Sequence, residues 1–267
     1  MERNRLDILL TQLGYADSRS KAQSLIKAGS VYVDGVRTEK PSTDVSSDAT
    51  IEVRGDHCPY VSRGGLKLEK ALRDFGVDPT GLVCSDAGAS TGGFTDCLLQ
   101  QGAKKVFAID VGTDQLVEKI RIDPRVVVME QTNIRYLTPA NLGERLDLSV
   151  LDVSFISLSL VLPTIRNLLK EDSGQVICLI KPQFEAGKAA VGKKGVVRDL
   201  AIHKRVLDDF LQLASQLDFT VLGLTFSPVR GPEGNIEFLA HLTRKKQESK
   251  QIDTGSVVRL AHETLKV

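Results

Sequence analysis

Short apolar runs alternate with amphipathic stretches along most of the chain from about residue 66 onward. Runs of four to six mostly apolar residues predict strands at 81–84, 105–109, 126–130, 148–151 and 175–180. Stretches whose apolar positions recur every three or four residues predict helices at 66–75, 95–99, 113–120, 158–169 and 199–217. Strands that alternate with helices indicate a parallel sheet with helices on its faces. We therefore expect an α/β fold for this part of the chain.

The last two apolar runs, 220–226 and 235–241, are separated by a turn at Gly231-Pro232-Glu233-Gly234. A pair of runs joined in this way predicts neighbouring antiparallel strands. We therefore expect one antiparallel strand at the end of a mostly parallel sheet. The residues that follow are rich in charge, and no element is assigned to 246–267.

Residues 1–58 have a different pattern, which predicts a small α+β domain. A first helix begins near Leu6 and ends at Gly14, and a second runs from Asp17 or Ser18 to Gly29. Two short apolar runs on either side of Asp34-Gly35 predict a β-hairpin, and a further strand is expected at 50–53. Residues 54–62 follow neither period and predict a linker. The expected domains are therefore 1–58 and 59–245, followed by the tail 246–267.

A glycine-rich stretch, S-D-A-G-A-S-T-G-G-F at 85–94, lies between a predicted strand and a predicted helix. Glycines let a backbone approach a ligand closely, and a helix start offers free N–H groups. The next strand ends at Asp110, where a carboxylate can accept from the hydroxyls of a ribose. The stretch does not match the G-x-G-x-x-G dinucleotide pattern. It predicts a nucleoside-cofactor site, and the alternative is a glycine turn that only closes an α/β unit.

Charged residues follow three predicted strands, namely Asp110, Asp152 and Lys181. Ligands of open α/β sheets bind beyond the carboxyl ends of the strands, so these side chains are candidates for chemistry. Alternatively, each charge only reaches solvent at a strand end. Residues 181–198 contain five basic residues and one acidic residue, a net charge of +4, in a long glycine-broken connection. Such a loop suits a polyanionic substrate, and a surface loop is the alternative.

Composition restricts the remaining classes of function. The net charge is +1, so any attraction of nucleic acid depends on local basic patches. Four cysteines and four scattered histidines show no metal-ligand spacing, so we expect no metal. No apolar run approaches the roughly 18 residues of a membrane span, and no export signal is evident, so we expect a cytoplasmic protein.

The acidic residue two positions before the first glycine of 85–94 resembles the first motif of class I S-adenosylmethionine methyltransferases. That resemblance implies a Rossmann-like methyltransferase sheet and S-adenosylmethionine as the cofactor. It also implies that Asp86 accepts from the ammonium group of the methionine part, directly or through a water. The implied cofactor-binding residues are Asp86, Gly88, Ala89, Ser90, Thr91, Gly92, Phe94, Asp110, Asn133 and Asp152.

The front domain resembles the S-four-type RNA-binding domain, through Arg5-Leu6-Asp7, Ser18–Ala22 and Gly29–Gly35. Basic side chains gather on its helices, and phosphate-directed RNA contact is expected there, with a solvated helix face as the alternative. The candidate RNA-binding residues of the whole chain are Arg3, Arg5, Arg19, Lys21, Lys27, Arg63, Lys188, Lys193, Lys194 and Arg198.

Several motifs together resemble the TlyA family, also labelled hemolysin A, whose members methylate ribose in ribosomal RNA. They are V-S-R-G-G-L-K-L at 61–68, D-A-G-A-S-T-G-G-F at 86–94, A-I-D-V-G at 108–112, L-D-V-S-F-I-S at 151–157, I-K-P-Q-F-E at 180–185 and G-N-I-E-F at 234–238. The catalytic domain of that family is similar to FtsJ-type ribose methyltransferases, which carry a Lys-Asp-Lys-Glu tetrad. By this resemblance the catalytic residues are Lys67, Asp152, Lys181 and Glu237, and for Lys67 a surface position is the alternative.

The resemblance implies methylation of a ribose 2′-hydroxyl, of cytidine, in ribosomal RNA or ribosomal subunits. A ribose hydroxyl is a weak acid, and a lysine near another lysine gives up its proton more easily, so the residue types suit this reaction. The alternatives are a pseudouridine synthase-like enzyme, whose reaction needs no cofactor, and a membrane-active hemolysin. The target nucleotide, the ribosomal subunit and the oligomeric state do not follow from the sequence.

Overall fold

The computed structural model describes residues 3–13, 15–16, 18–27, 29–46, 48–53, 58–187, 190–192, 195–248 and 250–265. The chain forms two compact units, residues 1–57 and 58–267. Each unit has its own apolar core. Among the described helices, none combines the length and apolar character that a membrane crossing requires.

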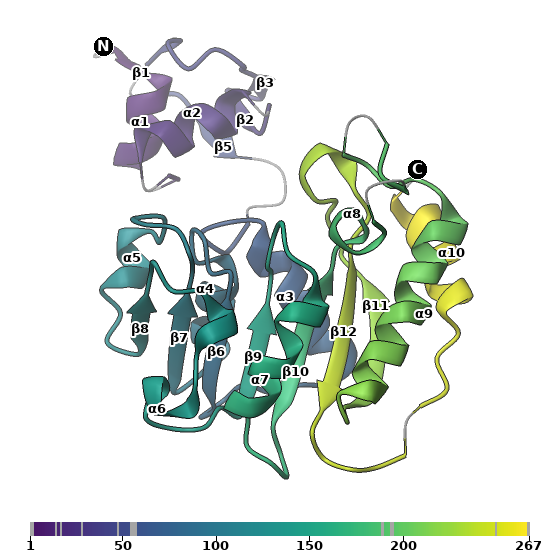
Figure 1. The fold of residues 1–267 in the computed structure, drawn as a ribbon. Helices are drawn as coiled ribbons and strands as arrows, with labels where there is room; N and C mark the ends of the chain where they lie inside the picture. The colour runs from purple at the N-terminus through teal and green to yellow at the C-terminus, as the bar shows by residue number, and fades with distance from the viewer. Residues whose placement is uncertain are drawn as a thin grey trace. The chain divides into compact units, whose positions relative to one another are not determined.

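The first unit packs two helices against two small antiparallel sheets (Figure 1). Its elements are β1 (Arg3–Arg5), α1 (Leu6–Gln12), α2 (Arg19–Lys27), β2 (Val31–Val33), β3 (Val36–Arg37), β4 (Asp44–Ser46) and β5 (Ile51–Val53). The predicted hairpin is confirmed, because β2 pairs with β3 around Asp34 and Gly35, both of which have positive φ, at 50° and 79°. Positive φ at both central residues is what a two-residue hairpin turn requires.

A buried carboxylate joins the two helices of this unit. Asp7 has no exposed surface, and its oxygens accept from Arg5 Nε at 3.0 Å, Arg19 Nε at 2.9 Å and Gln23 Nε2 at 2.8 Å. The hydrogen bond from Arg5, with those from Gln23 and Arg19, holds the pKa of Asp7 well below its usual value, although burial acts in the opposite direction. The ionised form of Asp7 therefore stabilises the packing of α1 on α2.

We expect Asp7→Asn to weaken the first unit at neutral pH. A carboxylate whose pKa is lowered on folding contributes stability above its ordinary pKa of 3.8, and this stability is lost as the pH falls below that value. Protection of the α1 amides against hydrogen exchange in the full-length chain, corrected for intrinsic rates, measures the effect. The difference between wild type and variant should shrink on acidification, and a pH-independent difference would contradict a role for the charge.

The second unit is built on a seven-stranded sheet in the order β11-β12-β10-β9-β6-β7-β8 (Figure 1). Its strands are β6 (Val83–Ala87), β7 (Lys105–Ile109), β8 (Val126–Met129), β9 (Leu148–Leu151), β10 (Gln175–Ile180), β11 (Thr220–Phe226) and β12 (Phe238–Thr243). Strands β8, β7, β6, β9 and β10 pair in parallel, and β12 runs antiparallel to both β10 and β11. The expected mostly parallel sheet is thus confirmed, with β12 one place in from the edge strand β11.

Helices cover both faces of this sheet. They are α3 (Gly64–Phe75), α4 (Gly93–Gln100), α5 (Glu118–Arg121), α6 (Pro139–Leu142), α7 (Leu162–Leu168), α8 (Pro182–Glu185), α9 (Leu200–Gln216) and α10 (Thr254–Leu265), with 3₁₀ turns at Ile134–Tyr136, Leu158–Leu160 and Pro232–Gly234. Successive residues of β7 belong to different cores: Val106 and Ala108 belong to the core that includes residues of α3 and α4, whereas Phe107 and Ile109 belong to the core that includes residues of α7 and α9. Burial on both faces explains why these strands read as unbroken apolar runs.

The helix predicted at 113–120 is wrong for most of its length, because only Glu118–Arg121 is helical there. The backbone N–H groups of Gln115 and Leu116 donate to the Glu130 carboxylate, at 3.1 and 3.3 Å, instead of to helix carbonyls. Asp114 also has a positive φ of 52°, which a helix does not allow. A carboxylate from the end of β8 therefore overrides the local helical pattern.

The unassigned tail contains α10, which packs against α9 and β11. Thr254 Oγ1 donates to Asp208 at 2.6 Å, and the rings of His203 and His262 are joined by a hydrogen bond of 2.9 Å. Val258 and Ala261 are buried in the core that α9 shares with the sheet. The C-terminal helix is therefore part of the second unit.

Candidate active site

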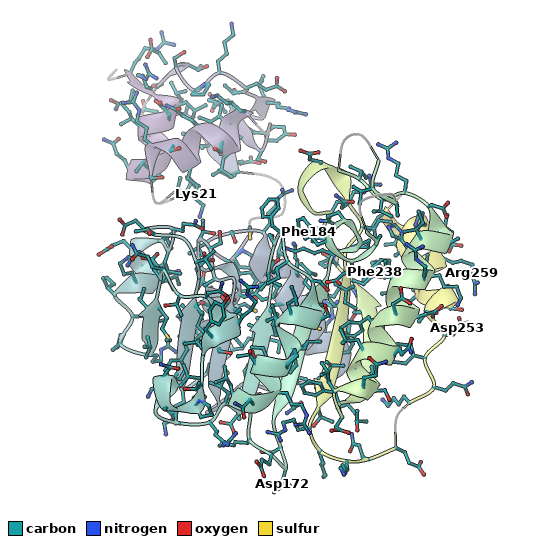
Figure 2. All side chains as sticks on the ribbon, in the orientation of Figure 1. Lys21, Asp172, Phe184, Phe238, Asp253 and Arg259 are labelled. Carbon is teal, nitrogen blue, oxygen red and sulfur yellow. The ribbon has the colours of Figure 1, made fainter. Side chains whose placement is uncertain are left out.

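The carboxyl ends of β6, β7, β9 and β10 meet at one edge of the sheet (Figure 1). Asp110, Asp152 and Lys181 follow β7, β9 and β10 directly, as the strand pattern predicts. Phe184, labelled in Figure 2, lies in α8 beyond the same edge, whereas Asp172 lies at the opposite edge. Polar groups from distant parts of the sequence therefore converge on one side of the sheet.

Two lysines and two carboxylates alternate at this edge. Lys67 Nζ lies 2.6 Å from Glu237 Oε2 and 3.7 Å from Asp152 Oδ2. Lys181 Nζ lies 2.5 Å from Asp152 Oδ1. The order Glu237–Lys67–Asp152–Lys181 balances two positive charges with two negative charges, and Lys67, Lys181 and Glu237 are buried. The four residues expected from the motifs thus come together, and the surface alternative for Lys67 is wrong.

Local structure holds each member of this charged chain in place. Lys67 lies in the first turns of α3, and Glu237 immediately precedes β12. A Cβ atom at Gly231 would lie 2.2 Å from Glu237 Oε1, so only glycine permits this turn to pass so close to the carboxylate. The Lys181 ammonium also donates to Ser154 Oγ at 2.8 Å. Gln183 Nε2 lies 3.4 Å from Glu237 Oε1.

The glycine-rich stretch passes directly beside Asp152. Gly88 has a φ of +86°, and a Cβ atom there would lie 2.7 Å from the carbonyl oxygen of Asp152. Asp86, just before it, is fully buried; its Oδ2 accepts from the backbone N–H and hydroxyl of Thr95, at 2.9 and 2.7 Å, and its Oδ1 has no partner. Burial raises the pKa of Asp86 to about 7. Asp86 therefore ties β6 to the first turn of α4 behind the loop.

Two cavities meet at this loop. The first, of about 240 Å³, is lined by Lys67, Asp152, Arg63 and the glycine-loop residues Gly88, Ala89, Ser90, Thr91 and Phe94. The second, of about 420 Å³, is lined by Gly88, Ser90, Asp110, Asn133 and Asp152, together with apolar residues. Among the described residues that line these two cavities, neither Asp86 nor Gly92 is found. Gly92 is the N-cap of α4. The other expected cofactor residues all face one cavity or both.

The Asp110 carboxylate is fixed at the mouth of the second cavity. Its Oδ2 accepts from Ser90 N at 2.8 Å, and its Oδ1 accepts from Gly112 N at 2.7 Å. Asn133, on the next connection, caps a 3₁₀ turn by accepting from Arg135 N at 3.1 Å. A carboxylate oxygen that accepts one hydrogen bond keeps a free lone pair, so Asp110 can still accept from a ligand hydroxyl.

An aromatic pair beside the charged chain was missed by the sequence reasoning. Phe155 is 91% exposed and has a φ of +63°, and its ring centroid lies 5.1 Å from that of Phe184. Both rings, with Gln183, line a third cavity of about 500 Å³. The available signal was an aromatic residue shortly after a strand-end charge in both L-D-V-S-F and I-K-P-Q-F. An exposed apolar ring at a ligand-binding edge points to a binding role.

The candidate RNA-binding residues do not form one described cluster. Arg5 and Arg19 converge on Asp7 in the first unit, where Arg3, Lys21 and Lys27 are also exposed. Arg63 lines the first cavity, and Arg198 is exposed just before α9. Lys188, Lys193 and Lys194 lie outside the described residues. In the described parts of the chain, no group of three or more His, Cys, Asp or Glu residues is placed to hold a metal ion.

The chain is similar to known proteins over both of its units. An FtsJ-like methyltransferase model matches residues 60–244, and an S4 domain model matches residues 4–51. The chain is 46% identical over 241 residues to the Mycobacterium tuberculosis protein named 16S/23S rRNA (cytidine-2′-O)-methyltransferase TlyA, covering 90% of each chain. It is 44% identical over 238 residues to hemolysin A of Brachyspira hyodysenteriae, covering 89% of this chain and 98% of that one.

A solved structure described as a hemolysin from Streptococcus thermophilus superposes with a TM-score of 0.78 at 45% identity, covering 100% of this chain and 98% of that one. The family model spans the whole seven-stranded sheet, and the relatives extend over both units. The chain therefore belongs to the FtsJ-like methyltransferases and, within them, to the TlyA family.

Proposed function

We propose that this protein transfers the methyl group of S-adenosylmethionine to a ribose 2′-hydroxyl of ribosomal RNA in the cytoplasm. The observation that carries the proposal is the alternating chain Glu237–Lys67–Asp152–Lys181 beside two joined cavities. The M. tuberculosis relative is named for cytidine 2′-O-methylation, and we propose the same nucleoside here. When bound, S-adenosylmethionine supplies an electrophilic methyl group on a sulfonium.

The two cavities fit the two ends of this cofactor. The larger cavity combines the Asp110 carboxylate, which suits the paired hydroxyls of a ribose, with the apolar residues Ile109, Val111 and Ile134, which suit a base. The smaller cavity brings the glycine loop beside Lys67 and Asp152, and it suits the methionine part. The unpartnered Oδ1 of Asp86 supports its expected role as an acceptor for the ammonium group through a water.

The charged chain then acts on the substrate hydroxyl. Lys181 either accepts the proton of the 2′-hydroxyl or, as a cation, stabilises the alkoxide that develops as the methyl group is transferred. Asp152 contacts both ammonium groups and sets their positions, and Glu237 holds Lys67. Most of the acceleration comes from holding the hydroxyl in line with the methyl donor.

The aromatic pair suits the base of the target nucleotide. An enzyme that modifies a nucleotide inside structured RNA must first expose it, and exposed bases stack on aromatic side chains. Phe155 and Phe184 present such a surface next to Lys181, whose Nζ lies 5.9 Å from the Phe184 ring centroid. The S4 domain supplies RNA affinity without contributing to the chemistry, and the basic residues that follow Lys181 in the connection 181–198 add to that affinity.

The test is methylation of purified ribosomal subunits and of naked 16S and 23S rRNA with labelled S-adenosylmethionine. We expect one or a few 2′-O-methylcytidines, mapped by mass spectrometry of nuclease fragments. A base-methylated product would reject ribose chemistry, and label in neither RNA would reject the proposal. Lysis of red cells by purified protein without RNA methylation would favour the membrane-active alternative, and new pseudouridine that forms without the cofactor would favour the synthase.

We expect Asp110→Asn to weaken binding of S-adenosylmethionine by ~1–3 kcal/mol, the usual effect of losing a hydrogen bond to a charged group. Titration calorimetry in the absence of RNA measures this effect. Asp123→Asn is the matched control, because Asp123 also accepts from a backbone N–H two residues later but outside both cavity linings. Equal affinities of wild type and Asp110→Asn would remove Asp110 from the cofactor site.

A further inference from the structure

Glu185 is a half-buried carboxylate next to the proposed site that the chemistry above does not use. It ends the short helix α8, which begins directly after Lys181. Its Oε2 accepts from Ser157 Oγ at 2.7 Å, and its Oε1 accepts from Leu158 N at 2.8 Å. Among the described basic residues, none forms an ion pair with it. A carboxylate that is partly removed from water and has no cation beside it needs other partners, and these two hydrogen bonds supply them.

The two bonds tie α8 to the segment that carries Phe155. Phe155 has a φ of +63°, a conformation that residues with a side chain rarely adopt and that persists only where the surroundings hold it. Ser157 and Leu158, two and three residues later, are the partners of Glu185. Phe184, the neighbour of Glu185 in the chain, provides the second ring of the pair. One side chain thus connects both halves of the aromatic pair.

We propose that Glu185 is a positioning residue that locks the Phe155 segment onto α8 and so keeps the aromatic pair in place to hold the base of the target nucleotide. This inference rests on the proposed function for the role of the pair. Its structural part, the lock itself, is independent of that function. Burial raises the pKa of Glu185, which agrees with a group that serves by hydrogen bonding.

The lock can be measured without any substrate, because the chain contains no tryptophan. Phe155→Trp therefore introduces a single tryptophan, which can be excited selectively in the presence of the four tyrosines and whose anisotropy reports nanosecond motion of the segment. Glu185→Ala in this background should lower the anisotropy clearly. Glu185→Gln should preserve it, because the amide oxygen can accept from Leu158 N and the amide nitrogen can donate to the Ser157 hydroxyl. Unchanged anisotropy in Glu185→Ala would overturn the lock.

Asp147→Ala is the matched control for general destabilisation. Asp147 also accepts from a backbone N–H, that of Val83 at 3.0 Å, but it precedes β9 at the opposite end of the sheet. The anisotropy of the tryptophan should not change in this variant. Thermal unfolding followed by circular dichroism confirms that each variant is folded at the temperature of the measurement. A fall in anisotropy equal to that of Glu185→Ala would mean that any loss of stability loosens the segment, which would also overturn the lock.

A double-mutant cycle tests whether Glu185 acts through the aromatic pair. Phe155 also lines the second cavity, so the KM for RNA is measured at saturating S-adenosylmethionine. Phe155→Ala and Glu185→Ala should each raise this KM by about 10- to 100-fold, the range expected for one lost base stack. The double variant should be no worse than Phe155→Ala alone, since residues that act as a unit are not additive. Additive losses, or full activity of Phe155→Ala, would overturn the positioning role. If the wild type methylates no RNA, the proposed function fails, and the anisotropy still decides whether Glu185 is a lock.

Discussion

Lys181→Ala should lower the single-turnover rate of methyl transfer by ~10²–10⁴-fold, the usual effect of losing a general acid or base. The affinities for S-adenosylmethionine and RNA should stay nearly unchanged. The reason lies in the position of this lysine, which directly follows β10 and is buried beside the joined cavities. Its ammonium group lies 2.5 Å from the Asp152 carboxylate and 2.8 Å from Ser154 Oγ. We expect a change of packing alone at a strand end to cost much less, and the unchanged affinities check that the site stays formed.

Lys181→Arg separates the possible roles of this lysine. A guanidinium does not give up its proton under these conditions, and its planar fork does not fit the space of an ammonium. The arginine variant should therefore fail as a base, whereas it would substitute for a lysine that only binds phosphate. Lys170→Ala is the matched control: this lysine also pairs with an aspartate, at 2.6 Å, but near the amino end of β10. A near-native rate with arginine would assign Lys181 to RNA positioning and make Lys67 the better candidate for the base.

Lys67→Met should destabilise the second unit by about 3–5 kcal/mol and abolish methyl transfer. Glu237 is fully buried, and its carboxylate lies 2.6 Å from the Lys67 ammonium. Removing the cation leaves a buried negative charge with a weak hydrogen bond from Gln183 Nε2, at 3.4 Å, as its other side-chain hydrogen bond among the described residues. Urea unfolding followed by circular dichroism measures the loss of stability.

The double variant Lys67→Met/Glu237→Leu should recover most of the stability but none of the activity, because apolar residues of similar volume often replace a buried ion pair without loss. Lys105→Met is the matched control for burial. Lys105 and Glu144 are also 2.6 Å apart, but their side chains are 39% and 38% exposed, so the change should be within about 1 kcal/mol. Equal losses of stability in Lys67→Met and Lys105→Met would mean that burial does not set the energy of the Lys67–Glu237 pair.

Local patterns were sufficient for much of the architecture. The Asp34-Gly35 hairpin follows from the backbone conformations that these two residues tolerate. Apolar runs predict the strands at 105–109 and 175–180. The charged residues directly after these runs, Asp110 and Lys181, are therefore expected at the strand ends. Each of these features depends on residues within a few positions of one another.

The pattern failed where a distant group supplies the decisive contact. Residues 113–117 are not helical, because Glu130 accepts from their backbone. Helix α10 was not assigned, since its apolar face is visible only against α9 and β11. Phe155 and Phe184 lie in separate motifs, 29 residues apart by their numbers, and only the fold makes them a pair.

The sequence alone determined the fold class, through its alternating strand and helix patterns, and the position of the glycine loop. It also determined which residue types stand at the ends of the strands. Family resemblance then gave Lys67, Asp152, Lys181 and Glu237 as candidates. Only the tertiary structure decided that these four form one alternating chain of charges. Lys67 and Glu237 are 170 residues apart and meet because β12 inserts antiparallel between β10 and β11, which brings Glu237 to the edge where the parallel strands end. Burial and contact between distant elements depend on how strands pair across the sheet, and no local period of the chain encodes that pairing.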